Sequence, residues 1–284
     1  MIPQPRIAII GPGVMAEAII SGMLRRQVTG AQQISASGPD AERNAELQAH
    51  YNILPFSDNA ASVAGADMVI LSIKPQRLDK VLAGLRGCIS PQALVLSIVA
   101  GAPIQFISAG LQHGAVVRAM PNTPAQIGEG IAVWTCSAEV TAEQRELARE
   151  VLTALGQEVL VEEENYLDMA TALSGTGPAY VFLFAEAMID AGVHLGFPRR
   201  IAEQLVLQTL RGSVDYYQTR KDHPAQLRNE VTSPGGTSAA ALYYLEKAGF
   251  RTAISRAVWA AYERSQELGK GRQSQPPETP AKEG

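Results

Sequence analysis

A short apolar segment that leads into a glycine-rich turn constrains this chain more than any other feature. Residues Ile7–Ile10 are followed by Gly11-Pro12-Gly13-Val14-Met15-Ala16, which fits the pattern GxGxxA, and then by a helical pattern. In such a unit the first glycine allows a tight turn, and the second lets the backbone approach a phosphate. The free N–H groups at the helix start then face an anion. This position favours a dinucleotide-binding loop over an ordinary strand–helix turn.

The first 162 residues alternate between short apolar segments and helical patterns. The apolar segments are 6–10, 33–37, 68–73, 94–99, 116–120, 130–135 and 157–161, and the helical patterns are 14–26, 39–50, 76–86 and 141–155. Most of these segments are too apolar to face water on one side, which is typical of a parallel sheet covered on both faces. We therefore expect an α/β domain with a doubly wound sheet over 1–162. Thr141 or Ser137 is the candidate N-cap of its last helix.

The second half has a different character. Residues 167–195, 198–217, 239–247 and 251–268 carry helical spacing of apolar residues, and glycines separate these segments. We expect an all-helical second domain over 163–268. Residues 269–284 are rich in Lys, Gln, Pro and Glu and predict a disordered tail.

Composition excludes several classes of protein. The 284 residues include 24 Lys and Arg against 28 Asp and Glu, a formal charge of −4 that argues against a nucleic-acid binder. Only Cys88 and Cys136 are present, so a disulfide framework or structural zinc is not expected, and a cytoplasmic location is the simplest. No His stands at metal or triad spacing, so we expect no metal. The N-terminus predicts no signal peptide, and we expect no membrane span.

The end of the second apolar segment bears on the choice of dinucleotide. NAD-binding domains usually place Asp or Glu there to bind the ribose hydroxyls, whereas this segment ends Ser35-Ala36-Ser37-Gly38-Pro39. Hydroxyl groups that lead into a helix start can accept a 2′-phosphate, with Arg43 nearby to assist. We therefore expect NADP, although Ser37 could also serve only as an N-cap.

Two further polar residues follow later segments. Lys74, in Ile73-Lys74-Pro75-Gln76, either binds a phosphate or ribose by charge or is a solvated loop residue, and spacing alone does not decide. Asn59, taken by itself, is a candidate helix cap.

With these residues in view, the chain resembles the Δ1-pyrroline-5-carboxylate reductase family over almost its whole length. The matching stretches are Gly11–Met15, residues 73–76, 120–124 and 174–180, and Val231–Ser238. The resemblance implies an NAD(P)H-dependent reductase that makes L-proline, the last step of proline biosynthesis. It also implies a Rossmann domain followed by a helical dimerisation domain. In this family the helical domains interlock, so that each active site uses both subunits, and decamers of five dimers are common.

The resemblance also assigns site residues. It implies cofactor contacts, with NADPH or NADH, at Gly11, Pro12, Gly13, Val14, Met15, Ser37, Asn59, Ile73, Lys74, Pro75 and Ala100. It implies contacts to the cyclic imine substrate at Glu164, Glu230, Thr237 and Ser238. On sequence alone Glu164 is part of a solvated acidic linker. The chain departs from the family pattern at three places, where it has Thr176 for Ser, Ser238 for Thr and the pair Asn229-Glu230.

The implied chemistry gives the segment Ser233-Pro234-Gly235-Gly236-Thr237-Ser238 a role. Gly235 and Gly236 free the backbone, so that N–H groups can bind the substrate carboxylate at a helix start. The Ser238 hydroxyl can hydrogen-bond the ring nitrogen as donor or acceptor, which makes it the candidate catalytic residue. Without the resemblance, a turn before a helix capped by Ser233 or Thr237 is an equally good interpretation.

Two other functions compete with this one. A β-hydroxyacid dehydrogenase shares the glycine-rich loop and a helical second domain but carries a catalytic lysine on the long inter-domain helix, and residues 167–195 contain no lysine. A protein that binds NADP without catalysis is the other alternative, and the hydroxyl-rich loop argues against it.

Overall fold

The computed structural model describes residues 4–273. They form two compact units: residues 4–176 together with 260–273, and residues 177–259. The predicted domain boundary between 162 and 163 stays a prediction. The last helix, α12 (Phe250–Gln273), extends through residues 269–273, which were predicted to be disordered. The rest of that predicted tail, 274–284, lies outside the described residues.

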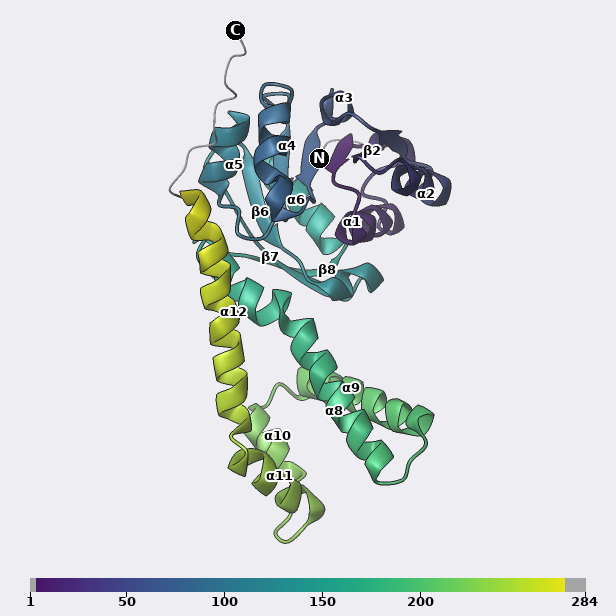
Figure 1. Cartoon of the computed structure of the whole chain (residues 1–284), viewed down its shortest axis with the longest axis vertical. Helices are drawn as coiled ribbons and strands as arrows, with labels where there is room; N and C mark the ends of the chain where they lie inside the picture. Colours follow the sequence, from purple (N-terminus) through teal and green to yellow (C-terminus); the bar gives the residue numbers. More distant parts are fainter. Residues whose placement is uncertain (1–3, 274–284) are drawn as a thin grey trace. The chain divides into compact units, whose positions relative to one another are not determined.

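The first unit is built on a single sheet (Figure 1). Its strand order is β3-β2-β1-β4-β5-β6-β7-β8, with consecutive strands parallel except for the antiparallel pair β6 and β7. The chain reverses its direction of winding between β3 and β4, so the carboxyl ends of β1 and β4 flank a crevice where ligands bind in such sheets. The strands are β1 (Ile7–Ile10), β2 (Ile34–Ser37), β3 (Leu54–Phe56), β4 (Met68–Leu71), β5 (Leu94–Ser97), β6 (Val116–Met120), β7 (Gly130–Cys136) and β8 (Gly156–Leu160).

Helices cover both faces of this sheet, and alternate strand residues divide between two cores. Ile7 and Ile9 point into one core, which α1 (Val14–Arg25), α2 (Ala41–Tyr51) and α6 (Ala142–Thr153) complete. Ala8 and Ile10 point into the other, beneath α3 (Asn59–Val63), α4 (Leu78–Leu85) and α5 (Ile104–Leu111). The predicted α/β class and doubly wound sheet are confirmed, and the central strands β1, β4 and β5 are apolar because both of their faces are buried.

One strand and two α-helices of the first unit were not predicted. The strand β3 has three residues and includes Pro55, which is tolerated because β3 is the edge strand of the sheet. The short helix α3 follows it, capped by the Asp58 carboxylate rather than by Asn59. The helix α5 was also missed. The expectation that the strands run parallel is wrong for β7, which is antiparallel to β6 because only residues 121–129 connect the two.

The second unit is helical, as predicted. It contains α8 (Gly177–His194), α9 (Arg199–Arg220), α10 (Pro224–Glu230), α11 (Thr237–Lys247) and the start of α12. Helix α8 continues a helical run that begins with α7 (Tyr166–Ala170) and a turn of π-helix (Thr171–Gly175). This run, Tyr166–His194, contains an 18-residue stretch with a mean hydropathy of 1.2 and is long and apolar enough to cross a membrane by length and composition. The sequence had predicted no membrane span.

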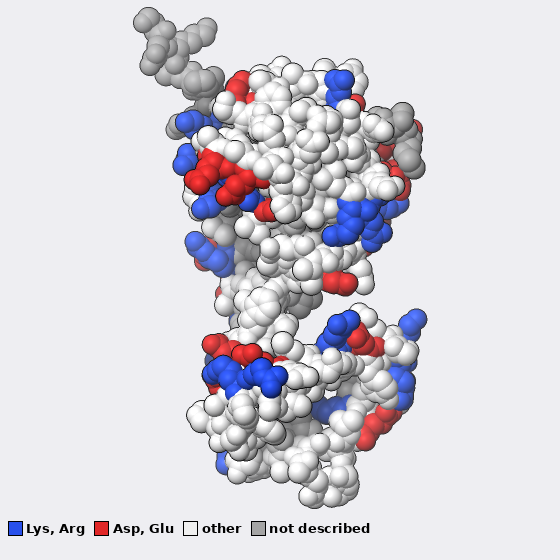
Figure 2. Space-filling model, turned by 90° about the vertical axis from the view of Figure 1, so that its right-hand side faces the viewer, with Lys and Arg blue, Asp and Glu red and all other residues white. Residues whose placement is uncertain are grey.

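Charged side chains are distributed in small groups over the surface. On the face drawn in Figure 2, Lys and Arg lie next to Asp and Glu in several places, with wide uncharged areas between them. The ion pairs Arg149–Glu146 and Arg199–Asp190 are examples of such local pairing. This mixed pattern matches the small net charge of the chain.

Candidate functional site

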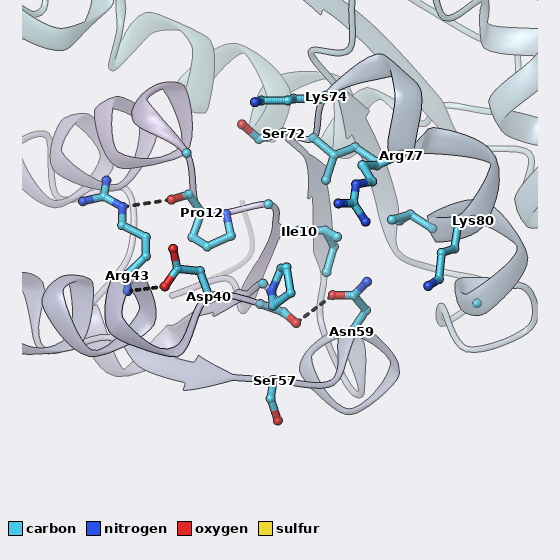
Figure 3. A pocket seen from close by; sticks show the side chains of 18 of the residues that line it. Ile10, Pro12, Asp40, Arg43, Ser57, Asn59, Ser72, Lys74, Arg77 and Lys80 are labelled. Atoms are coloured by element: carbon cyan, nitrogen blue, oxygen red, sulfur yellow. Dashed lines mark hydrogen bonds between the residues drawn. The ribbon is translucent and has the colours of Figure 1, made fainter.

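A pocket of about 900 Å³ lies at the carboxyl ends of β1, β2 and β4 (Figure 3). Four segments contribute most of its wall: the turn after β1, the turn after β2, the start of α3 and one face of α4. This is the expected crevice of a doubly wound sheet. Its lining residues are Ile10, Gly11, Pro12, Gly13, Val14, Glu17, Ser37, Gly38, Pro39, Asp40, Arg43, Ser57, Asp58, Asn59, Ala60, Ser72, Ile73, Lys74, Arg77, Lys80, Val81 and Gly84.

The glycine-rich turn has the geometry that an approaching phosphate needs. Gly11 has a φ of 92°, and a Cβ there would lie 2.6 Å from Ile73 Cγ2 and 2.7 Å from the Ser72 carbonyl oxygen. Gly13 is the N-cap of α1 and makes no side-chain cap, so N–H groups of the first helical turn remain available. A Cβ on Gly13 would meet nothing within 4 Å, which leaves open space in front of those groups. The turn therefore fits the pyrophosphate of a dinucleotide.

Ser37 and Asn59 meet at the floor of the pocket. The Ser37 hydroxyl donates to Asn59 Oδ1 across 2.7 Å, although the two residues belong to different elements. Ser37 is fully buried. Asp40, not Ser37, caps α2, because its carboxylate accepts from the Arg43 backbone N–H at 3.1 Å. The alternative that Ser37 is only an N-cap is therefore wrong.

The Arg43 side chain is held in place by polar partners. Its Nε donates to the Pro12 carbonyl oxygen at 3.0 Å, Nη1 pairs with Glu46 at 3.2 Å, and Nη2 pairs closely with Glu17. The Arg43 hydrogen bond holds the pKa of Glu17 below its ordinary value, and the same bond raises the pKa of Arg43. Arg43 thus ties α2 to the glycine-rich turn.

The pocket contains most of the predicted cofactor residues but not all of them. It is lined by Gly11, Pro12, Gly13, Val14, Ser37, Asn59, Ile73 and Lys74. Met15, Pro75 and Ala100 do not line it. Two cations on the α4 side, Arg77 and Lys80, line the pocket and were missed by the sequence analysis. Their spacing from Val81 and Gly84, which places all four on one helical face, was the available signal.

Glu164 is not part of a solvated linker. Its Oε1 accepts from Arg118 Nη1 and from the Ile104 backbone N–H, both at 2.8 Å. Arg118 is buried and also contacts Asp168, whose carboxylate accepts from the Ser265 hydroxyl at 2.8 Å. This network joins β6, the start of α5, α7 and the end of α12 within the first unit.

The hydroxyl-rich loop lies in the second unit, between α10 and α11. Gly235 has a φ of 73°, and the Gly236 N–H donates to the Ser233 carbonyl oxygen at 3.0 Å, so the segment is a tight turn. Helix α11 begins at Thr237 with Gly236 as its N-cap and no side-chain cap. The predicted capping by Ser233 or Thr237 is therefore wrong, and Ser238 stands in the first turn of α11.

Glu230 precedes this loop at the end of α10. Both of its carboxylate oxygens accept from Arg220, at 3.0 and 3.3 Å. Arg220 also pairs with Asp222, and these carboxylates raise the pKa of the guanidinium, with the Asp222 bond as the larger cause. Glu230 and the loop residues belong to the second unit, whereas Glu164 belongs to the first.

The sheet, the glycine-rich turn and the pocket define the class: an α/β domain that binds a dinucleotide. Residues 6–101 match the family "NADP oxidoreductase coenzyme F420-dependent", and residues 164–268 match the family "Pyrroline-5-carboxylate reductase dimerisation". A pyrroline-5-carboxylate reductase of Synechocystis sp. is 43% identical over 265 residues, covering 93% of this chain and 98% of that protein. One of Pseudomonas aeruginosa is also 43% identical, covering 94% and 97%.

A solved structure agrees with this assignment. The pyrroline carboxylate reductase of Plasmodium falciparum with NADP bound matches with a TM-score of 0.86 and 30% identity, covering 93% of this chain and 98% of that one. This chain belongs to the pyrroline-5-carboxylate reductase family. It is an NAD(P)H-dependent oxidoreductase that reduces 1-pyrroline-5-carboxylate to L-proline, in proline biosynthesis. The two competing functions, a β-hydroxyacid dehydrogenase and a non-catalytic NADP-binding protein, are thereby set aside.

The match also explains the apolar surface of the helical unit. Residues 164–268 are a dimerisation domain, which implies a homodimer. Side chains on α8 such as Phe182 and Leu183 are about two-thirds exposed in a single chain. A subunit interface buries such surfaces, so the apolar run 166–194 is accounted for without a membrane.

Proposed function

We propose that the chain reduces its cyclic imine with NADPH in preference to NADH, and that residues of the two units divide the work. The pocket of the first unit holds the cofactor through Gly11, Pro12, Gly13, Val14, Ser37, Asn59, Ile73 and Lys74. The preference for NADPH rests on the absence of a carboxylate at the end of β2 and on the Ser37–Asn59 pair there. Met15, Pro75 and Ala100 contribute through the backbone of the segments that carry them.

The substrate role of the loop 233–238 is supported by one observation above all. The N-terminus of α11 has no side-chain cap, behind a turn in which Gly235 has a positive φ. The backbone N–H groups of the first turn of α11, from Thr237 onward, are therefore free to bind the substrate carboxylate, and the positive end of the helix dipole favours it. Thr237 adds a hydroxyl at the same point.

The reaction requires the protein mainly to position the substrate against the cofactor. When bound, the reduced nicotinamide supplies the hydride to the imine carbon. In the first turn of α11, the Ser238 hydroxyl donates to the ring nitrogen of the imine, or accepts from the iminium, and holds the ring so that one face is presented for reduction. A protonated imine is already a good electrophile, so no strong general acid is needed.

The two acidic residues act at a distance from the reacting atoms. Glu164 positions the start of α5 by accepting a hydrogen bond from the Ile104 N–H. Glu230, fixed by Arg220, orients the chain that enters the loop. We further propose that both subunits of a dimer contribute to each active site, that five dimers assemble into a decamer and that the enzyme is cytoplasmic.

The test of the loop assignment is the pair Ser238→Ala and Ser238→Thr, assayed by loss of reduced-nicotinamide absorbance with 1-pyrroline-5-carboxylate. We expect Ser238→Ala to lower kcat by about 100-fold, because one donor to the reacting ring is lost. NADPH binding, measured by fluorescence titration, should stay at the wild-type level. Ser238→Thr keeps the hydroxyl and should retain most of the activity. If the affinity for NADPH falls in parallel with kcat, Ser238 stabilises the fold rather than binding the substrate.

A further inference from the structure

The pocket face of α4 combines two cations with a valine and a glycine. Arg77 ends the 3₁₀ turn that leads into the helix (Pro75–Arg77), and Lys80, Val81 and Gly84 follow on α4. All four line the pocket. Their spacing of three, four and seven residues places them on one face of a helix. A Cβ on Gly84 would meet nothing within 4 Å, so the surface beside Val81 is open.

The two cations have no carboxylate to neutralise them. Among the described residues, neither the Arg77 nor the Lys80 side chain forms an ion pair or hydrogen bond with another side chain. The three carboxylates that line the pocket are occupied elsewhere. Glu17 pairs with Arg43, Asp40 caps α2, and Asp58 accepts from two backbone N–H groups at the start of α3. A partly enclosed pocket with two uncompensated cations favours an anion.

Arg43, which was expected near the 2′-phosphate, differs from Arg77 and Lys80 because its side chain is already paired. It has two carboxylate partners and a backbone carbonyl, so each of its nitrogens is engaged. Figure 3 shows Arg77 and Lys80 on the side of the pocket opposite Arg43 and Asp40. Binding a phosphate at Arg43 would require breaking existing ion pairs, whereas binding at Arg77 and Lys80 requires none to break.

We propose that Arg77 and Lys80 bind the 2′-phosphate of the adenosine half of NADPH and determine the preference for NADPH over NADH. The phosphate carries about two negative charges, which a guanidinium and an ammonium together match. Asn59 contributes Nδ2 as a neutral donor, because its Oδ1 already accepts from Ser37. Val81 and Gly84 provide the apolar surface for the adenine ring. This inference rests on the proposed preference for NADPH.

The first measurement is made on the wild-type enzyme. Its kcat/KM with NADPH is compared with that for NADH at a fixed, saturating concentration of 1-pyrroline-5-carboxylate. A clear preference for NADPH supports the proposed function. Equal values would overturn that preference and this inference together, without involving any variant. The two proposals therefore fail in distinguishable ways.

The second measurement uses Arg77→Gln, Lys80→Gln and the double variant. Each single change should raise the KM for NADPH by about tenfold, and the double change by more, because each removes a charge-assisted hydrogen bond. The KM for NADH and the kcat with either cofactor should stay near the wild-type values. Arg26→Gln is the matched control, since Arg26 is exposed and does not line the pocket.

Binding without turnover provides an independent readout. Adenosine 2′,5′-bisphosphate and ADP are used as competitive inhibitors against NADH. In the double variant, inhibition by the bisphosphate should weaken by about tenfold or more while inhibition by ADP is unchanged. Equal weakening of both inhibitors, or no change in either, would overturn the assignment. In Arg43→Gln, inhibition by both compounds should weaken alike, because Arg43 supports the glycine-rich turn. If inhibition by the bisphosphate alone weakened in that variant, Arg43 would be the residue that binds the phosphate.

Discussion

The two units of this chain bury their apolar side chains in different ways. In residues 4–176 the sheet is covered on both faces, and its strands β1, β2, β4, β5 and β6 are almost completely buried. In residues 177–259, the buried apolar residues are Ala185, Ala202 and Val206. Large apolar side chains there remain exposed, among them Val181, Phe182, Leu183, Leu195, Leu207, Val214, Val231, Tyr243, Tyr244 and Trp259.

This difference indicates where each unit obtains its stability. The first unit contains the hydrophobic core that a domain of its size needs. The helical unit exposes many large apolar side chains, a pattern that is typical of a subunit interface. Since it lies in the dimerisation domain of the family, we expect the second subunit of a homodimer to cover this surface. The stability of the first unit should therefore be independent of protein concentration, and that of the second should depend on it.

The largest expected effect comes from a charge placed on the exposed apolar surface. Phe182→Glu removes a large apolar side chain from α8, whose exposed fraction is 65% in the single chain, and puts an ionised group in its place. By the two-fold symmetry of a homodimer the change occurs twice. We expect the dissociation constant of the dimer to rise on the order of 1000-fold or more, measured by analytical ultracentrifugation.

The control for this change is Gln218→Glu, which introduces the same residue at an exposed polar position on α9 and should leave the dimer intact. NADPH binding should survive in Phe182→Glu, because the pocket is lined by residues of the first unit alone. A Phe182→Glu protein that remains dimeric would show that this part of α8 is not in the interface.

A smaller effect, with matched chemistry in the two units, comes from Leu96→Ala and Leu207→Ala. Leu96 lies on β5 and is completely buried, so its truncation should lower the free energy of unfolding of the first unit by about 2–5 kcal/mol at every protein concentration. Leu207 lies on α9 and is largely exposed in one chain. Its truncation should lower the melting temperature chiefly in dilute protein, where the dimer dissociates. Calorimetry over a wide concentration range separates the two behaviours. Equal dependence on concentration in both variants would contradict the contrast between the units.

Sequence reasoning recovered the elements whose signals are local. The turn from β1 into α1 carries its own glycine pattern, and α6 carries the Thr141–Gln144 capping box that the structure contains. The reversal of β7 was not predictable in this way, because apolarity marks a strand but not its direction. The edge strand β3 was missed because Pro55 weakens a strand signal only three residues long.

The residues of the candidate site also divide into those with a local sequence signal and those without one. Ser37 could be assigned because a strand end in this fold has a known relation to the cofactor. Arg77 and Lys80 could not, since a cation on a helix is normally solvated, and only the fold shows that their face lines the pocket. Arg43 shows the reverse error: the sequence placed a cation near the phosphate site but could not reveal Glu17 as its partner.

The smallest expected effect compares one ion pair from each unit. The pKa of Glu17 is lowered below its ordinary value of 4.5, first by its hydrogen bond from Arg43, and that of Glu246 is lowered by its bond from Arg251. A lowered pKa in the folded state stabilises the protein above the ordinary value, and this contribution is lost as the pH falls through the lower folded value. Glu17→Gln should thus lower the free energy of unfolding at neutral pH by at most about 1 kcal/mol, since both side chains are partly exposed. The difference from wild type should vanish on acidification below the lowered pKa of Glu17.

Glu246→Gln is the matched change in the helical unit, on a pair whose side chains are at least half exposed. Its effect at neutral pH should be smaller than that of Glu17→Gln and should disappear in high salt, because solvent and ions screen an exposed pair. Urea unfolding followed by circular dichroism, with and without added salt, measures both. If the effect of Glu17→Gln persists undiminished in acid, then Glu17 acts through its hydrogen bond from the Tyr51 hydroxyl rather than through its charge. In that case the electrostatic contrast between the two units would be lost, while the contrast in apolar burial would stand.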